Sequence, residues 1–277
     1  MSETLPVYLV HWGAPDWVAS SARSILASDI PVSVTVIDNG PEASSVELVL
    51  PDDVRVVASG SNLGYAGGAN IGLREWLNGS GNYCIVGAHD LHVEPDTLRL
   101  LLEVAEQNPE FGILGPKVEG GGKGDRLGQG DGIEEYVWLS GTCLLFTRSC
   151  VEHIGLFDEL LHSYAEDHEI GLRSNRSGYK VGLVDSARAH GLGSKSSDAQ
   201  LMWMGNRIVL QARYEGIQAV IPMVASYLRT AFRSAVGMMV LRGRRRSGHR
   251  LTVRRYLGAT YIGLRKLSAG RWRQPRF

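Results

Sequence analysis

The sequence predicts an α/β fold with a mostly parallel central sheet, followed by a basic helical extension towards the C-terminus. Short runs rich in β-branched residues alternate with helix-like segments, and 277 residues with 44% hydrophobic content can fill a large core. The extension is indicated by charge, because residues 222–277 hold 14 of the 29 Lys and Arg residues and no Asp or Glu.

Each predicted strand is a short apolar run bounded by polar residues or Gly, and helical patterns lie between several of these runs. We expect strands at Val7–Trp12, Val32–Asp38, Val54–Ser59, Tyr83–Ala88, Trp138–Phe146 and Val181–Val184. We expect helices at Pro15–Ser28, Gly68–Leu77 and Pro95–Asn108. The Gly-rich run from Glu119 to Gly132 is expected to be a loop, either a simple connector or a lid over a ligand.

Polar side chains stand at the expected carboxyl ends of the strands, where sheets of this class bind ligands. Asp38 and Asn39 end the second strand, and Asp90 closely follows the fourth. In an extended segment Asp90 and His92 would face the same way, and His190 follows the last strand. Carboxylate and imidazole groups can hold a divalent cation, although each residue alone is more typical of a turn or surface position.

A second candidate centre is the acidic pair Glu166-Asp167, at the start of a helical pattern. A carboxylate can remove the proton from a hydroxyl nucleophile and so act as a general base. Acidic residues at a helix start are also ordinary capping residues, and the pattern alone favours this capping interpretation.

Six segments, in this order, resemble the family 2 glycosyltransferases of GT-A fold, most closely their rhamnosyltransferase-like branch. They are VIDNG, NLGYAGGANIGL, HDLHVEPDTL, WLSGTCLLFTR, GLFDELLHSYAEDHEIGLRSNRSGY and ARAHGLGS. The resemblance covers about residues 5–215. It implies a GT-A catalytic domain, and the charge division sets the expected bounds of this domain at residues 1–221, with a separate basic amphipathic helical tail at 222–277.

The resemblance also assigns roles to individual residues. It implies that Asp167 is the base and that Glu166 orients the acceptor. It implies a metal site, for Mn²⁺ or Mg²⁺, on Asp90, His92 and His190; the histidine at 92 departs from the family's acidic motif and favours Mn²⁺. The donor-binding residues that it implies are Asp38, Asn39, Asn62, Gly64, Asn70, Trp138 and Gly141.

The expected activity is metal-dependent, inverting transfer of a sugar such as rhamnose from a nucleotide-diphosphate donor. The acceptor would be a hydroxyl of a glycan or a lipid-linked molecule, as in cell wall or polysaccharide biosynthesis. Two alternatives are a nucleotidyltransferase, whose basic Gly-rich N-terminal loop is missing here, and a catalytically inactive sugar-binding relative. Nucleic-acid binding is disfavoured because the basic tail carries no recognised readout motif and residues 1–221 are acidic.

The tail from residue 222 to residue 277 combines helical apolar spacing with clustered arginines. This pattern is typical of a helix that lies on an anionic membrane surface. The alternatives are packing on the acidic domain and a homodimer interface. The run Ile221–Leu241 carries Arg229 and Arg233, so we do not expect a membrane-spanning helix.

Cys84, Cys143 and Cys150 lie in or beside apolar runs, so we expect buried, reduced thiols and not a disulfide framework. The N-terminal segment resembles a first strand more than an export signal. The expected location is therefore cytoplasmic, with peripheral attachment at the inner face of the cell membrane.

Overall fold

The computed structural model describes residues 4–13, 15–40, 47, 49–119, 122–130, 132–191, 197–240 and 244–270. Two compact units can be distinguished. The sheet unit consists of Met1–His162 and Glu166–Gly193, and the helical unit consists of Ser163–Ala165 and Ser194–Phe277.

A ten-stranded sheet runs through the sheet unit in the order β3-β2-β1-β4-β9-β6-β10-β8-β7, with β5 paired to β10. Strands β1, β2, β3, β4, β6 and β10 run in the same direction, so the sheet is mixed with mostly parallel strands, which confirms the predicted α/β class. The strands are β1 (Leu5–His11), β2 (Val32–Asp38), β3 (Arg55–Ala58), β4 (Tyr83–Ala88), β5 (Leu91–Val93), β6 (Phe111–Glu119), β7 (Arg126–Gln129), β8 (Ile133–Tyr136), β9 (Cys143–Thr147) and β10 (Lys180–Gly191).

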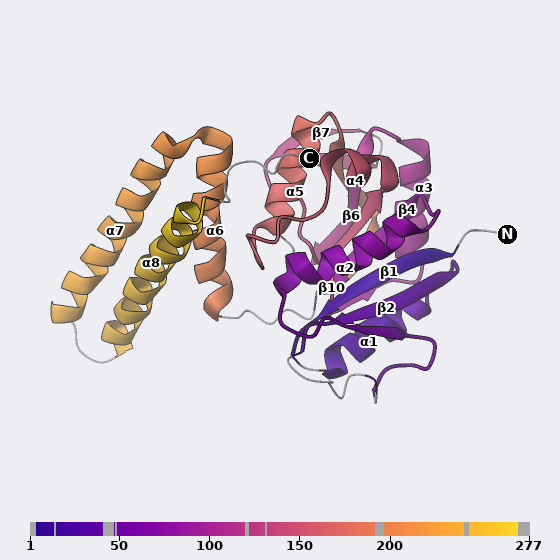
Figure 1. Cartoon of the computed structure of the whole chain (residues 1–277), viewed down its shortest axis with the longest axis horizontal. Coiled ribbons are helices and arrows are strands. Elements are labelled where there is room, and N and C mark those ends of the chain that lie inside the picture. The colour runs from indigo at the N-terminus through magenta and orange to yellow at the C-terminus, as the bar shows by residue number, and fades with distance from the viewer. Residues whose placement is uncertain are drawn as a thin grey trace. The chain divides into compact units, whose positions relative to one another are not determined.

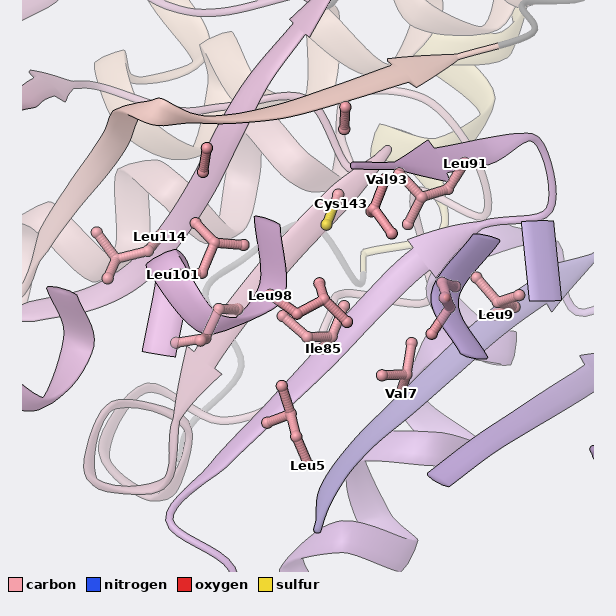
Figure 2. Packing of buried hydrophobic residues seen from close by; sticks show 14 of the residues in the cluster. Leu5, Val7, Leu9, Ile85, Leu91, Val93, Leu98, Leu101, Leu114 and Cys143 are labelled. Carbon is pink, nitrogen blue, oxygen red and sulfur yellow. The ribbon is translucent and has the colours of Figure 1, made fainter. Parts of the chain in front are cut away.

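Helices cover both faces of this sheet (Figure 1). They are α1 (Pro15–Leu26), α2 (Gly64–Asn78), α3 (Thr97–Gln107), α4 (Arg148–Ile154) and α5 (Glu166–Arg176). Side chains of β1 alternate between the faces: Leu5, Val7 and Leu9 pack with α1 and α3, while Tyr8 and Val10 pack with α2, α4 and α5. Figure 2 shows the first of these cores, in which β1, β4, β5 and α3 contribute most of the labelled side chains.

The strand register brings the candidate residues to one edge of the sheet. His11, the last residue of β1, pairs with Asp38, the last residue of β2, and Val10 pairs with Ala88 at the end of β4. Because these strands are parallel, the segments that follow them emerge at the same edge. This edge is where the sequence placed the ligand site.

Three expectations about the elements differ from the structure. Of the predicted strand Trp138–Phe146 only its second half is strand, as part of β9, because residues 137–142 leave the sheet between β8 and β9. The Gly-rich run contains β7, which pairs with β8; its residues 120, 121 and 131 lie outside the described residues. Strand β10 continues to Gly191 along β6 and β5, so that His190 lies within the strand and not after it.

The helical unit contains α6 (Ser197–Glu215), α7 (Ile217–Val240) and α8 (Arg244–Ser268), and each contacts the other two. The unit includes α6, whereas the charge pattern had placed the boundary between residues 221 and 222. Residues 241–243 and 271–277 of the expected tail lie outside the described residues. Among the residues that are described, no helix combines the length and apolar character that crossing a membrane requires.

Buried polar groups join α6 to α8 and to the segment at residues 163–165. Asn206 on α6 is fully buried, and its side-chain amide donates hydrogen bonds to the carbonyl oxygens of Ser163 (3.0 Å) and Tyr164 (2.6 Å). The Lys266 ammonium of α8 donates to Asn206 Oδ1 at 2.6 Å. Arg207, the neighbouring residue, stacks over the ring of Trp203. Asn206 therefore has a structural role in the helical unit.

Candidate functional site

Asp167, in the first turn of α5, has a carboxylate fixed by backbone donors. The Gly141 N–H donates to Asp167 Oδ2 at 3.1 Å, and the His168 N–H donates to Asp167 Oδ1 at 2.8 Å. Burial raises the pKa of Asp167 above the usual aspartate range, and the hydrogen bonds from the backbone partly oppose this. The fold thus holds a half-buried carboxylate in a fixed orientation and makes it more basic than an ordinary aspartate.

Tyr65, in the first turn of α2, connects this carboxylate to the rest of the site. Its hydroxyl donates a hydrogen bond to the Gly141 carbonyl oxygen. The pKa of Tyr65 is raised well above its usual value, first by burial and then by the negative charges of Glu166, Asp167 and Asp90. Carboxylates from two distant parts of the sequence therefore act electrostatically on one hydroxyl group.

The turn into α2 needs the small residues of its motif. Gly64 has a positive φ of 71°, and a Cβ there would lie 2.3 Å from the His162 carbonyl oxygen. Asn62 Oδ1 accepts a hydrogen bond from the Gly64 N–H, and the Asn39 amide donates to the Gly64 carbonyl oxygen, both at 2.9 Å. Asn39 and Asn62 thus shape the turn that presents Tyr65.

Asn70 is also buried, but its amide binds other parts of the protein. It donates to the Phe157 carbonyl oxygen and to Glu159 Oε1, and it accepts from the Phe157 N–H, each at 2.9 Å. These contacts anchor the segment after α4 to α2. They give Asn70 a structural role.

Asp38 and His11 lie side by side at the ends of β2 and β1. Asp38 is 4% exposed, and its Oδ1 accepts a hydrogen bond from the Gly40 N–H at 2.9 Å. Burial lowers the pKa of His11 to about 4, with a further lowering from His89 and an opposing effect of Asp38. His11 is therefore neutral at physiological pH, and the ring of His89 lies 5.6 Å from it.

Trp138 lies in the segment between β8 and β9 and stacks on His168, with ring centroids 5.2 Å apart and an interplanar angle of 28°. Gly141, three residues later, is buried and makes contacts in two directions, with Tyr65 and with Asp167. The 137–142 segment, which overlaps the range predicted as a strand, thus contains the residue that binds the Asp167 carboxylate.

The candidate metal ligands have fewer fixed contacts than Asp167. His92 and His190 are direct partners of the antiparallel β5–β10 pair, so their side chains share one face. The His190 ring lies 3.4 Å from Glu119 Oε2 and 3.9 Å from Glu94 Oε1, and its side chain is half exposed. Across the described ranges, no group of three or more His, Cys, Asp or Glu residues is arranged to hold a metal ion.

A pocket adjoins the Asp167 contact. Its lining includes Lys117 and Val118 from β6, Lys123, and Leu139 and Ser140 from the segment before β9. Ser140 directly precedes Gly141, whose N–H binds Asp167. The pocket combines apolar walls with two ammonium groups; one of these, that of Lys123, donates a hydrogen bond to the Tyr136 hydroxyl at 2.7 Å.

The sequence model of the family described as "Glycosyl transferase family 2" matches residues 6–155, more than half of the chain. The chain belongs to this family. The match includes β1, β2, α2, β4 and β9, and therefore the edge that carries Asp38, Tyr65, Asp90 and Gly141.

Two relatives of this family 2 glycosyl transferase are themselves named as sugar transferases. An N-acetylglucosaminyl-diphospho-decaprenol L-rhamnosyltransferase of Mycobacterium tuberculosis is 29% identical over 242 residues, which cover 70% of this chain and 79% of the relative. A low-salt glycan biosynthesis hexosyltransferase of Haloferax volcanii is 24% identical over 168 residues, 53% of this chain and 54% of the relative. The first relative confirms the expected similarity to rhamnosyltransferases.

Solved structures confirm the GT-A fold. A mannosyltransferase from Pyrobaculum calidifontis, in complex with GDP-Man and Mn²⁺, matches with a TM-score of 0.57 at 12% identity over 95% of this chain and 88% of its own. GalNAc-T7 with UDP, GalNAc and Mn²⁺ matches with a TM-score of 0.60 at 12% identity over 84% of this chain. TarS from S. aureus matches with a TM-score of 0.54 at 16% identity over 78% of this chain. The chain spans 51% of GalNAc-T7 and 41% of TarS.

The structure of this family 2 glycosyl transferase places the predicted residues in two groups. The charges of Glu166, Asp167 and Asp90 act on Tyr65. His190 pairs with His92 across β10 and β5 and lies beside Glu119 and Glu94. Sequence reasoning missed Tyr65. The only signal for it was an aromatic residue inside the Gly-rich NLGYAGG motif, which is equally typical of a core residue.

The sequence analysis also missed two histidines, His11 and His89. His11 ends the first predicted strand and His89 precedes Asp90, so their places at the ligand edge were the available signal. All three cysteines are free and buried, as expected.

Proposed function

We propose that the protein is a metal-dependent, inverting glycosyltransferase that moves a sugar from a nucleotide-diphosphate donor to a hydroxyl group of a glycan or lipid-linked acceptor. The observation that carries this proposal is the fixed, half-buried carboxylate of Asp167, whose charge, like that of Asp90, raises the pKa of Tyr65. Family membership and the fold support the same chemistry.

Asp167 acts as the general base. In a single in-line displacement it accepts the proton of the acceptor hydroxyl while the acceptor oxygen attacks the anomeric carbon, and the configuration of that carbon inverts. The raised pKa supports this role, because a more basic carboxylate removes a hydroxyl proton more readily at a given degree of ionisation. Glu166 is 5% exposed and shares the same helix start, where we propose that it orients the acceptor.

Gly141 and Tyr65 position the base. The Gly141 N–H fixes one carboxylate oxygen of Asp167, and the Tyr65 hydroxyl donates to the carbonyl oxygen of the same glycine residue. The other carboxylate oxygen of Asp167 accepts a hydrogen bond from the His168 N–H and keeps a free lone pair that can take the proton of the acceptor hydroxyl. We propose that Trp138, stacked on His168, lies against the donor sugar.

Asp90, His92 and His190 would hold the divalent cation. The donor set fits an ion such as Mn²⁺, because it combines one carboxylate with two imidazoles, and the buried Nε2 of His92 has no hydrogen-bond partner. When bound, the cation would neutralise the charge of the diphosphate leaving group. Since the described residues contain no complete cluster of three, we propose that diphosphate oxygens complete the coordination.

The nucleotide would lie over the ends of β1 and β2, where Asp38, Asn39 and the turn at Asn62 and Gly64 surround the edge of the sheet. Rhamnose is the proposed sugar, on the strength of the Mycobacterium tuberculosis relative. The name of that relative includes a lipid-diphosphate-linked acceptor, which supports an acceptor of this class here. The pocket beside Ser140 is the proposed acceptor site.

We further propose that the reaction takes place at the cytoplasmic face of the membrane, in glycan or cell wall biosynthesis. The acceptor class of the relative and the reduced, buried cysteines support this location.

The test is transfer by the full chain in the presence of Mn²⁺. A panel of nucleotide sugars is first screened for a rise in melting temperature, since a donor that prefers the folded state stabilises it. The responding donor is then incubated with lipid-diphosphate-linked N-acetylglucosamine, and the anomeric configuration of the product is read by proton NMR. We expect an inverted linkage. Retention contradicts the single displacement, release of sugar 1-phosphate supports a nucleotidyltransferase, and donor binding without turnover supports an inactive relative.

A further inference from the structure

Most of the exposed large apolar side chains of the described chain lie on α7 and α8 of the helical unit. On α7 they form a stripe that we call the α7 outer face. Its members recur at intervals of four or seven residues, so they follow one side of the helix. They are Ile217, Ile221, Leu228, Phe232 and Val236.

The α7 outer face is not needed to hold the helical unit together. Val220, Ala231 and Ser234 are buried on the other side of α7, and α7 contacts α6 and α8. By contrast, Ile221 is 69% exposed and Phe232 is 70% exposed. Such exposure of aligned large apolar side chains marks an interaction surface.

Charge identifies the kind of partner. Arg229 and Arg233 are exposed beside the stripe, each one residue after a member of the α7 outer face. On α8, the exposed side chains Arg250, Arg254 and Tyr261 share a second face. No Asp or Glu occurs after Glu215, so the surface presents positive charge without compensation from acidic residues of the same segment.

We infer that the α7 outer face docks on the surface of an anionic lipid bilayer. The apolar stripe enters the boundary between headgroups and acyl chains, while the flanking arginines bind lipid phosphates. Tyr261 suits the same boundary, because its ring is apolar and its hydroxyl stays hydrated. The helix lies along the surface and does not cross the bilayer.

A second copy of the same face is a poorer partner. In a two-fold contact each face meets its own equivalent, so Arg229 and Arg233 would approach the arginines of the other copy without any acidic residue between them. If the α7 outer face of one copy bound the acidic sheet unit of another, the contact would join two different surfaces. Repeating such a contact tends to build open chains of molecules in place of a closed dimer. An anionic bilayer offers hydrocarbon and negative charge together.

The experiment is co-sedimentation of the full chain with vesicles, without donor or metal, so that its outcome does not depend on the proposed transferase activity. Vesicles of phosphatidylcholine alone are compared with vesicles that contain phosphatidylglycerol as well. We expect binding to the anionic vesicles, weakening as salt is added, and much weaker binding to phosphatidylcholine alone.

The decisive variant is Ile221→Glu with Phe232→Glu, and we expect it to lower the vesicle partition coefficient at least tenfold. Arg229→Gln and Arg233→Gln should each lower it about fivefold. The control is Leu127→Glu, which places one such negative charge on a 54% exposed apolar residue of β7 and should leave binding unchanged. Circular dichroism melting curves check that each variant is folded.

Equal binding of the double variant and the unmodified chain overturns the inference, as does the absence of binding to anionic vesicles. Sedimentation velocity supplies a further outcome. If the unmodified chain forms a dimer that the double variant abolishes, and vesicles do not bind, the occupant of the α7 outer face is a second copy.

Discussion

The base and the metal candidates belong to the same sheet unit, yet their surroundings differ. Both oxygens of the Asp167 carboxylate accept hydrogen bonds from backbone N–H groups, and its segment is braced by Gly141 and Tyr65. His190 is half exposed and lies near two acidic side chains that are themselves partly or largely exposed. The protein alone therefore orients the proposed base, and we propose that the metal side gains its order when a donor and a cation bind.

Asp167→Asn should have the largest effect, because it removes the proposed base and leaves the proposed metal ligands in place. Loss of the general base should lower kcat by about 10²- to 10⁴-fold while donor binding changes little. Steady-state kinetics and donor titration measure the two effects separately. Asp29→Asn, at an exposed aspartate paired with Arg99, is the matched control and should keep full activity.

The same variant should not be destabilised. Because the folded-state pKa of Asp167 is raised, the folded protein binds more protons than the unfolded chain between the two pKa values, and stability falls as pH rises through that window. Asparagine removes this cost, but its amide nitrogen cannot accept one of the two backbone hydrogen bonds. The two effects oppose each other, so the neutral-pH melting temperature should change little. A large decrease would mean that lost activity reflects a damaged fold.

The metal side should respond to cation concentration. His190→Ala and Asp90→Asn should raise the Mn²⁺ concentration for half-maximal activity by about 10- to 100-fold, with partial recovery at high Mn²⁺. His153→Ala, on α4 and next to Tyr179, provides a control histidine. An unchanged Mn²⁺ requirement in His190→Ala would remove His190 from the proposed ligand set.

Tyr65→Phe tests the bracing of the base with a smaller effect. Loss of one hydrogen bond to the Gly141 carbonyl oxygen should cost about 1 kcal/mol, or about a fivefold decrease in kcat, with KM little changed. A change confined to KM would instead place Tyr65 in contact with substrate.

The pH dependence of kcat/KM tests the proposed base separately from the proposed metal site. Transfer requires ionised Asp167, so kcat/KM should rise with pH through a pKa above the usual aspartate value of 3.8. In Asp167→Asn the residual activity should lose this acidic limb. If the limb persists unchanged in the variant, another group controls it.

The sequence predicted well those features that depend on local pattern. Asp38 and Asp90 follow apolar strands, and their place at the carboxyl edge follows from parallel strand order. The residues of the Trp138–Phe146 run are apolar enough for one strand, but the chain leaves the sheet there to bring Gly141 to Asp167 and Tyr65. A contact between residues so distant in the sequence leaves no local periodic signal.

The lack of a local signal for distant contacts also explains the other differences between the predicted and the observed structure. Strand β7 forms because it pairs with β8, although its own residues are rich in Gly and polar side chains. Asn70 resembled a donor-binding residue by motif, and only the structure reveals that its amide is occupied by Phe157 and Glu159. The boundary of the helical unit was hidden because α6 contains acidic residues, yet it packs with the basic helices α7 and α8.

The most direct test of the central claim, that the metal and the base share one cleft completed by the donor, is iron-directed cleavage. Fe²⁺ replaces Mn²⁺ in the presence of ascorbate, hydrogen peroxide and the nucleoside diphosphate of the identified donor, and mass spectrometry locates the backbone cuts. We predict nucleotide-dependent cuts beside residues 90 and 190 and in the neighbouring 137–142 segment that holds Asp167. Cuts that appear without nucleotide, or that fall elsewhere in the chain, would contradict the account.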